Sequence, residues 1–454
     1  MWRRAVTIYV RPARHGSPVI ATIKWNAFSG ENDWSVGGNW LGGMAPGPTD
    51  RALIQADSTF QVDIDSAVSV WKIQFDAFHA TLLQEPGAAI AAHTLDLVSG
   101  TVELNAANSV SEVDIGNATV ELGIAGALGN RTVHTGGTIA AMTDITLANP
   151  IVALDAGSFS AATGHTLILA GEITINGDAV SADPVPIAFG APDAGFSGTV
   201  VVAGTAFGGT DLPYEVSVDF GTLTSRAGAH SLALTGMLDD ASGVTVAGTL
   251  DLRHAAAGEI TLDDLYASGT LLGRTNQTFD IVDPKFDGTL SGNFTVDVSG
   301  TGYFHGALNK TTLDMQAGTD DLNIVGAGGN VTVRTEAGAN ATVSVGGGAA
   351  VHFSNFADGG TTAILYGDNL HYSFVSYSGG LEVVVHPHHA GESAYSLFFG
   401  GIADQSQLDF GIDGRGHAEV TLAASESPAQ SAHDAEVANL AAQASFVPPV
   451  HDGF

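Results

Sequence analysis

The chain has no cysteine, few basic residues and no long apolar run. Without cysteine it can form neither disulfides nor thiolate metal sites nor a cysteine nucleophile. Its 15 Lys and Arg stand against 48 Asp and Glu, and the formal net charge of −33 disfavours nucleic acid and anionic membrane surfaces as partners. No apolar segment approaches the roughly 20 residues that a membrane-spanning helix needs. These absences favour a secreted or cell-surface bacterial protein without membrane insertion.

Aromatic residues are nearly absent from a long central stretch, where Phe159 alone interrupts residues 79–188. Helix-length periodic patterns are also missing there, while Gly accounts for 58 of the 454 residues. The overall apolar content of 44% is nevertheless ample for a buried core. Such a core must come mostly from Val, Ile, Leu, Ala and Thr, and the β-branched members of this set favour strands.

What the central stretch does contain is a series of short, evenly spaced strand patterns. Successive patterns begin at Thr101, Thr119, Thr138 and Ser158, in steps of 18, 19 and 20 residues. A nearly constant period of one strand plus turns is typical of a solenoid, in which each coil buries its apolar face against its neighbours. The sequence therefore predicts an all-β fold, a parallel β-helix (β-solenoid) over residues 79–310.

Many of these strand patterns place one acidic residue between two aliphatic residues. Because alternate side chains of a strand face opposite ways, the aliphatic residues are expected inside and the carboxylates outside. The triplets lie at residues 95–97, 102–104, 113–115, 120–122, 250–252 and 296–298. Stacked coils would bring like charges together, which is unfavourable. Two arrangements relieve the repulsion: lateral staggering of the coils, or cations that bridge the carboxylates.

All five tryptophans lie at or before Trp71. After a leader expected to be disordered (residues 1–22), residues 23–78 form an aromatic-rich module with Trp34 and Trp40 around Gly and Pro turns. The tryptophans are expected to cap the open end of the solenoid, and a sugar-stacking platform is the alternative. The Asn39-Trp40 pair, the turn from Pro46 to Asp50 and the later Val-Asp-Ile-Asp run resemble the opening coil of bacterial autotransporter passengers. That resemblance implies a β-helix at a cell surface, and no enzymatic activity.

The rhythm breaks at residues 183–213, where four prolines predict long loops, which often carry binding sites. Over residues 311–358 the spacing shortens to nine or ten residues, which predicts β-roll-like coils with two strands each. The segment from Gly318 to Leu322 is similar to one calcium-binding nonapeptide of the RTX type. Asp320 and Asp321 are therefore candidate Ca²⁺ ligands, and Ca²⁺ is the one candidate cofactor.

Residues 359–424 form a second aromatic-rich β module, in which Tyr377, Phe398 and Phe399 are candidate interface or binding residues. Its late Asp413-Gly-x-Gly turn resembles the closing repeat of large alphaproteobacterial surface proteins thought to leave by type I secretion. The tail (residues 425–454) predicts an Ala-rich helix that begins near Ser427 and suits a type I secretion signal. The overall resemblance is thus to autotransporter-passenger-like or type I-secreted β-helix surface proteins.

Clusters that could carry chemistry are sparse. His386, His388 and His389 are at a spacing that can bind Zn²⁺ or Ni²⁺, although three histidines in one loop are more often an exposed polar turn. The adjacent acidic pairs at residues 239–240 and 263–264 point to opposite faces of a strand, so neither is a convergent hydrolytic site. The favoured hypothesis is a non-catalytic structural protein of a bacterial surface or matrix that associates with itself. The alternatives are a glycan-binding adhesin and a polysaccharide-degrading enzyme.

Overall fold

The protein is an all-β solenoid of stacked, mostly parallel coils, about 12 turns in all, as predicted. The computed structural model describes residues 20–27, 32–154, 156–175, 185–189, 197–202, 214–218, 222–225, 238, 241, 243–255, 259–262, 265–282, 284–315, 319–325, 330–335, 340–346, 348–358, 360–366, 370–386 and 394–423. Most of the predicted leader, most of the loops at residues 183–213 and the whole predicted helical tail lie outside this set.

The chain divides into two compact units, which are described separately. The first comprises Met1–Asp263 and Gly269–Leu272, and the second comprises Asp264–Ser268 and Gly273–Phe454. In the first unit the elements are β1 (Thr22–Lys24), η1 (Gly37–Asn39), β2 (Arg51–Gln55), β3 (Gln61–Ile64), β4 (Val68–Gln84), β5 (Ile90–Leu104), β6 (Ser109–Leu122), β7 (Val133–Thr135), β8 (Thr138–Ala141), β9 (Ile145–Leu147), β10 (Ile151–Ala153), β11 (Gly157–Leu169), β12 (Ile173–Ile175), β13 (Val185–Phe189), β14 (Ser197–Val202), β15 (Tyr214–Val218), β16 (Thr222–Ser225), β17 (Gly243–Val246), β18 (Thr249–Asp251), β19 (Glu259–Leu262) and β21 (Thr270–Leu272).

The second unit begins with short strands and ends in antiparallel hairpins. Its elements are β20 (Leu265–Ala267), β22 (Thr278–Val282), β23 (Lys285–Phe286), β24 (Thr289–Ser291), β25 (Thr295–Ser299), β26 (Thr301–Phe304), β27 (Ala307–Asn309), β28 (Thr311–Met315), β29 (Thr319–Val325), β30 (Asn330–Thr335), β31 (Asn340–Gly346), β32 (Ala350–Phe353), η3 (Phe356–Asp358), β33 (Thr361–Leu365), β34 (His371–Tyr377), β35 (Gly380–His386), β36 (Tyr395–Gly400), η4 (Gln405–Gln407), β37 (Leu408–Ile412) and β38 (Ala418–Leu422).

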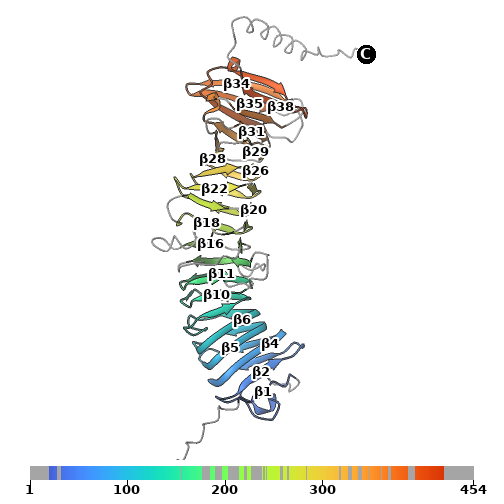
Figure 1. Cartoon of the computed structure of the whole chain (residues 1–454), viewed down its shortest axis with the longest axis vertical. Helices are drawn as coiled ribbons and strands as arrows, with labels where there is room; N and C mark the ends of the chain where they lie inside the picture. Colours follow the sequence, from blue (N-terminus) through green and yellow to red (C-terminus); the bar gives the residue numbers. More distant parts are fainter. Residues whose placement is uncertain are drawn as a thin grey trace, which may run out of the picture. The chain divides into compact units, whose positions relative to one another are not determined.

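The stacking of the first unit follows the predicted repeat. Thr101 pairs with Thr119, Thr119 with Thr138, and Thr138 with Ser158, all in parallel register, so the steps of 18, 19 and 20 residues are confirmed as coil lengths. The stacked ribbons of β4, β5 and β6 can be followed in Figure 1. The residue after each threonine points inward, and a continuous aliphatic column results. It runs through Val62, Leu82, Val102, Val120 and Ile139, each fully buried.

The carboxylates of the acidic triplets lie side by side, because the coils are in register. Asp96 pairs with Asp114, and Glu103 pairs with Glu121, so lateral staggering of the coils does not separate these charges. Basic side chains flank the first pair instead: Lys72 Nζ lies 2.7 Å from Asp96 Oδ2, and His134 Nδ1 lies 3.0 Å from Asp114 Oδ1. The protein thus places a lysine at one end of this short carboxylate column and a histidine at the other.

One of the acidic triplets departs from the expected pattern. Asp251 in β18 is buried rather than exposed, because the Arg253 side chain folds back over it. Arg253 Nε donates to Asp251 Oδ1 at 2.9 Å, and Arg253 Nη2 donates to Asp251 Oδ2 at 2.7 Å. Burial alone would raise the pKa of Asp251, but these hydrogen bonds and the positive charge of Arg253 lower it below its ordinary value.

The pKa of Glu121 shifts in the opposite direction, which allows a test of how its partly buried charge affects stability. Burial, and secondly the charge of Glu103, raise the pKa of Glu121 above its ordinary value of 4.5. The folded protein therefore takes up this proton before the unfolded chain does, so stability rises as the pH falls from neutral through the raised pKa. This gain in stability is complete at pH values below the ordinary pKa of 4.5.

We expect Glu121→Gln to raise the melting temperature at pH 7 by about 1–2 °C, since a partly solvated charge pair has a small effect. The increase should disappear at pH values below the ordinary pKa of 4.5, where the wild-type carboxyl is also neutral. Thermal unfolding of both proteins at the two pH values measures this. Glu85→Gln, at an exposed position, is the matched control. A pH-independent increase would show that the negative charge of Glu121 is not its cause.

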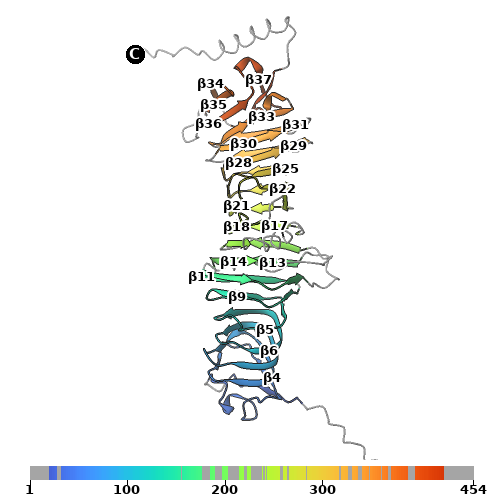
Figure 2. The same ribbon diagram turned by 90° about the vertical axis from the view of Figure 1, so that its left-hand side faces the viewer.

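In the second unit, successive coils contain two strands over the predicted β-roll segment. Strands β29, β31 and β33 pair in parallel on one side, and β28, β30 and β32 pair in parallel on another (Figure 2). The unit then changes from parallel to antiparallel pairing. β36 continues the sheet parallel to β32, whereas β35 and then β34 return antiparallel, and the hairpin β37–β38 adds to β33. The predicted Asp413 turn joins β37 and β38.

Candidate functional site

A pocket of about 360 Å³ lies in the second unit, beside the antiparallel return of the chain. Its floor is the outward face of β30, β32 and β36, and one wall is the hairpin β34–β35. Besides backbone and small apolar residues, six larger or polar side chains line it: Thr332, His352, Tyr377, Glu382, Ser396 and Phe398.

Strand register brings the floor residues together from distant parts of the chain. Thr332 pairs with His352, His352 pairs with Phe398, and Phe398 pairs in turn with Glu382. Alternation along each strand explains why these side chains face outward. Val351 and Phe353 on either side of His352 are buried, and the neighbours of Phe398 are buried likewise. The pocket is therefore built on rigid paired strands.

Two aromatic side chains and a histidine ring meet in the pocket. The ring of His352 stands edge-on to Phe398, with centroids 4.6 Å apart and an interplanar angle of 87°. Tyr377 lies 6.0 Å from Phe398, centroid to centroid, and 53% of its surface is exposed. Partial desolvation lowers the pKa of His352, which favours the neutral ring with one donor and one acceptor nitrogen.

The polar groups of the pocket are organised around one carboxylate. The Tyr377 hydroxyl donates a hydrogen bond of 2.9 Å to Glu382 Oε2. This bond, together with the negative charge of Glu382, raises the pKa of Tyr377, so the phenol remains protonated. Ser396 and Thr332 add hydroxyls on the floor. An apolar platform bordered by hydroxyl, imidazole and carboxylate groups is suited to a ligand with both C–H faces and hydroxyl groups.

The structure separates the three aromatic residues that the sequence singled out in this module. Tyr377 and Phe398 both line the pocket. Phe399 points the other way into the core, where it stacks on Phe353 at 5.2 Å and contacts Phe356 edge-on at 4.6 Å. His352 and Glu382 were missed by sequence reasoning. The signal was present, because each lies between two buried apolar residues in a strand.

The predicted tryptophan residues also divide into buried and exposed members. Trp34 and Trp40 are buried and contact each other edge-on at 4.7 Å, so neither offers a ring face for stacking on a sugar. Trp71 is 38% exposed and stacks on His93, with ring centroids 4.2 Å apart. Among the tryptophans that the structure describes, Trp71 is therefore the one whose ring a ligand could reach.

The candidate metal ligands do not form a cluster in the structure. The Asp320 side chain, His388 and His389 lie outside the described residues, while Asp321 is exposed on β29. His386 ends β35, where its Nε2 lies 3.2 Å from the Ser373 hydroxyl. Within the described ranges, no three His, Asp or Glu side chains converge as metal ligands. Calcium at Asp320 and Asp321 and a transition metal at the histidines stay predictions.

Comparison with known proteins adds no relative. No protein-family profile, curated protein or solved structure matches the chain. The resemblance to autotransporter-like and type I-secreted β-helix proteins stays a prediction. In the part of the chain that the structure describes, no helix combines the length and apolar character required to cross a bilayer.

Proposed function

We propose that the protein is a non-catalytic, secreted or cell-surface β-solenoid that binds a glycan in the pocket of the second unit. The observation that carries this proposal is the convergence of Phe398 and Tyr377 with the Glu382 carboxylate. Aromatic rings pack against the C–H faces of a sugar, and the carboxylate accepts its hydroxyl protons. The rings are held by paired strands, so little conformational entropy is lost on binding.

The same lining favours binding over hydrolysis. Glycoside hydrolysis ordinarily uses two carboxyl groups about 5–10 Å apart on opposite sides of the scissile bond. Glu382 is the one carboxylate among the described residues that line the pocket, and it accepts a hydrogen bond from Tyr377. Its charge and the net charge of −33 also favour a neutral or cationic sugar over a uronate.

Truncation of Phe398 tests the proposed site. We expect Phe398→Ala to weaken glycan binding by at least about tenfold, or about 1.4 kcal/mol, because it removes the central ring of the pocket. Binding of the wild type and the variant to an array of neutral, amino and acidic glycans measures the effect.

Phe374→Ala is the matched control, since Phe374 is a half-exposed aromatic residue on β34 that does not line the pocket. It should bind as the wild type does. Equal retention of glycans by Phe398→Ala and the wild type would contradict the assignment of the site. An array without any bound glycan would contradict the proposed function itself.

A structural role through self-association is the second candidate. It is favoured by β34, which is the last strand of its sheet among the described residues and exposes Phe374, Val375 and Tyr377. An exposed edge strand is a template for pairing with another chain. Electron microscopy of the purified protein distinguishes the two functions. Filaments or layers would favour assembly, and separate particles would favour the binding protein.

A further inference from the structure

The floor of the pocket continues beyond Thr332 as a column of threonines on the same sheet. Thr332 on β30 pairs with Thr312 on β28 in parallel register. Thr312 pairs in turn with Thr295 on β25, which pairs with Thr278 on β22. Strands in a sheet lie about 4.8 Å apart, so the column advances by one threonine per coil at that spacing. We call Thr278, Thr295, Thr312 and Thr332 the threonine track.

The threonine track and the pocket belong to one line of outward side chains. Thr332 pairs with His352, His352 pairs with Phe398, and Phe398 pairs with Glu382. A ligand that packs on Phe398 and extends past His352 therefore reaches Thr332 and the rest of the track. Beyond Phe398 in the other direction, the hydrogen-bonded Tyr377 and Glu382 side chains border the pocket.

The hydroxyls of the threonine track are accessible to a ligand. All four side chains are half-buried on the outward face of their strands, and each is followed by a buried apolar residue. Among the residues that the structure describes, none of the four hydroxyls has a hydrogen-bond partner. A hydroxyl both donates and accepts, so each can exchange its water for a hydroxyl of a sugar.

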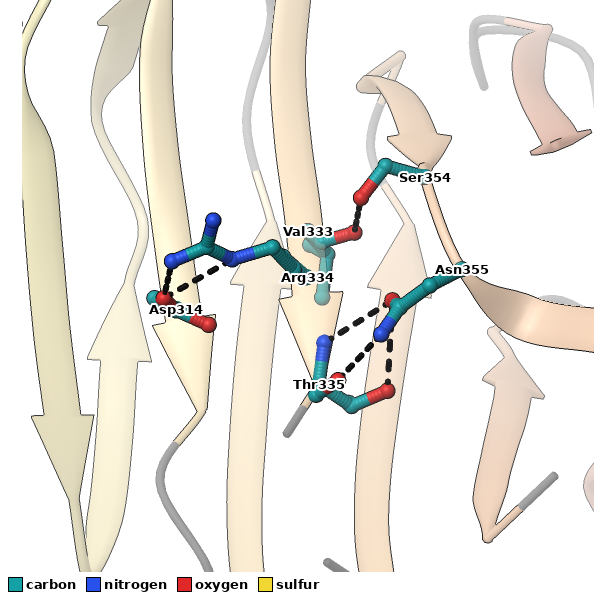
Figure 3. Close-up of polar contacts among 6 residues, drawn as sticks. All are labelled: Asp314, Val333, Arg334, Thr335, Ser354 and Asn355. Carbon is teal, nitrogen blue, oxygen red and sulfur yellow. Dashed lines mark hydrogen bonds and ion pairs between the residues drawn. The ribbon is translucent and has the colours of Figure 1, made fainter. Parts of the chain in front are cut away.

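Other polar groups precede and follow the threonines along the strands. Two residues after Thr332, Arg334 Nε donates to Asp314 Oδ2 at 2.8 Å, and Arg334 Nη2 donates to the same oxygen, as Figure 3 shows. The Asp314 side chain is 2% exposed and that of Arg334 is 56% exposed, so the guanidinium and not this carboxylate is accessible to a ligand. Two residues before Thr295 and Thr312, the exposed side chains are Asn293 and Lys310.

We propose that the glycan of the pocket is a linear polysaccharide, with one ring on Phe398 and the following rings along the threonine track. This inference rests on the proposed glycan-binding function. An uncharged, β-linked chain of the cellulose or chitin kind fits best, because it is straight and its rings advance by close to one strand spacing. Side chains of both charges flank the track, Lys310 and Arg334 as well as Asp280, so the track itself favours neither an acidic nor a cationic sugar.

Isothermal titration with cello-oligosaccharides and chitin oligosaccharides, from disaccharide to hexasaccharide, tests the extent of the site. For the wild type, we expect one of the two series to bind at least about tenfold more tightly as the hexasaccharide than as the disaccharide. The reason is that each added ring gains hydrogen bonds to the track.

The test variant is Thr295→Val/Thr312→Val, which removes two hydroxyls of the track and nearly preserves side-chain shape. It should bind the disaccharide as the wild type does and lose most of the gain with length. The matched control is Thr101→Val/Thr119→Val, the same change at half-buried threonines paired in the same way in the first unit. This control should keep the whole gain. Circular dichroism verifies that both variants retain the β fold.

Equal affinity of the wild type for disaccharide and hexasaccharide would overturn the inference, and so would an undiminished gain with length in the track variant. In either case, weaker binding to Phe398→Ala would still support the pocket. If neither series binds while the array retains another glycan, the extended chain is wrong and the pocket proposal stands. An array that retains no glycan would overturn both.

Discussion

Replacement of Trp40 by alanine is expected to destabilise the first unit by about 3–5 kcal/mol, the usual cost of truncating a buried aromatic residue. Trp40 is 2% exposed and contacts Trp25 and Trp34 edge-on at 5.0 and 4.7 Å. Its Nε1 also donates a hydrogen bond of 2.7 Å to the Trp34 carbonyl. The substitution thus removes the centre of a three-ring cluster and leaves a buried carbonyl without its donor.

Intrinsic fluorescence during denaturant unfolding measures this loss, because the four tryptophans that the structure describes all lie between Trp25 and Trp71. The matched control is Trp71→Ala, since the Trp71 ring is partly exposed and stacks on one histidine. Trp71→Ala should lower the free energy of unfolding by less than about 1.5 kcal/mol. Similar losses for the two variants would contradict the view that Trp40 seals this end of the solenoid.

The second large effect is expected from Phe399→Ala, at about 3–5 kcal/mol in the second unit. The Phe399 side chain is fully buried, lies parallel to Phe353 and meets Phe356 edge-on. Its removal leaves a cavity between the last parallel coil and η3, and the packed rings around it can close that cavity only in part. Hydrogen exchange of β32 and β36 amides measures the loss locally, which matters because solenoid units need not unfold in one step.

Phe398→Ala is the informative comparison, because the two residues are neighbours with opposite roles. Phe398 is half-buried at the pocket, so its truncation should lower stability less than that of Phe399 while weakening glycan binding at least about tenfold. Phe399→Ala should keep its binding under conditions in which it remains folded. If the Phe398 variant were the less stable of the two, the inward and outward assignments on β36 would be wrong.

Much of the fold could be predicted from the sequence, because one repeat determines both the coil length and the face of each side chain. The spacing of Thr101, Thr119 and Thr138 gave the parallel register directly. The ion pairs that neutralise the carboxylates of the acidic triplets could not be predicted in this way. Lys72 and Asp96 are 24 residues apart and do not pair in the strand register, so their ion pair depends on side-chain conformation.

The pocket was predictable only in part. Tyr377 and Phe398 were singled out by their aromatic character, but His352 and Glu382 join them through a change of pairing that the repeat does not contain. The chain leaves β32, forms the β34–β35 hairpin and returns as β36, which pairs with β32 in parallel and with β35 antiparallel. A repeat pattern predicts each coil from the one before it, so a hairpin inserted between two coils gives no periodic signal.

The most direct test of the proposed function is isothermal titration of the glycan best retained on the array into three proteins: the wild type, Phe398→Ala and Trp71→Ala. Trp71 is the alternative aromatic platform, on the first unit. We predict one glycan site on the wild type, at least tenfold weaker binding to Phe398→Ala, and unchanged binding to Trp71→Ala. Loss of binding in Trp71→Ala with full affinity in Phe398→Ala would contradict the account and place glycan recognition on the tryptophan.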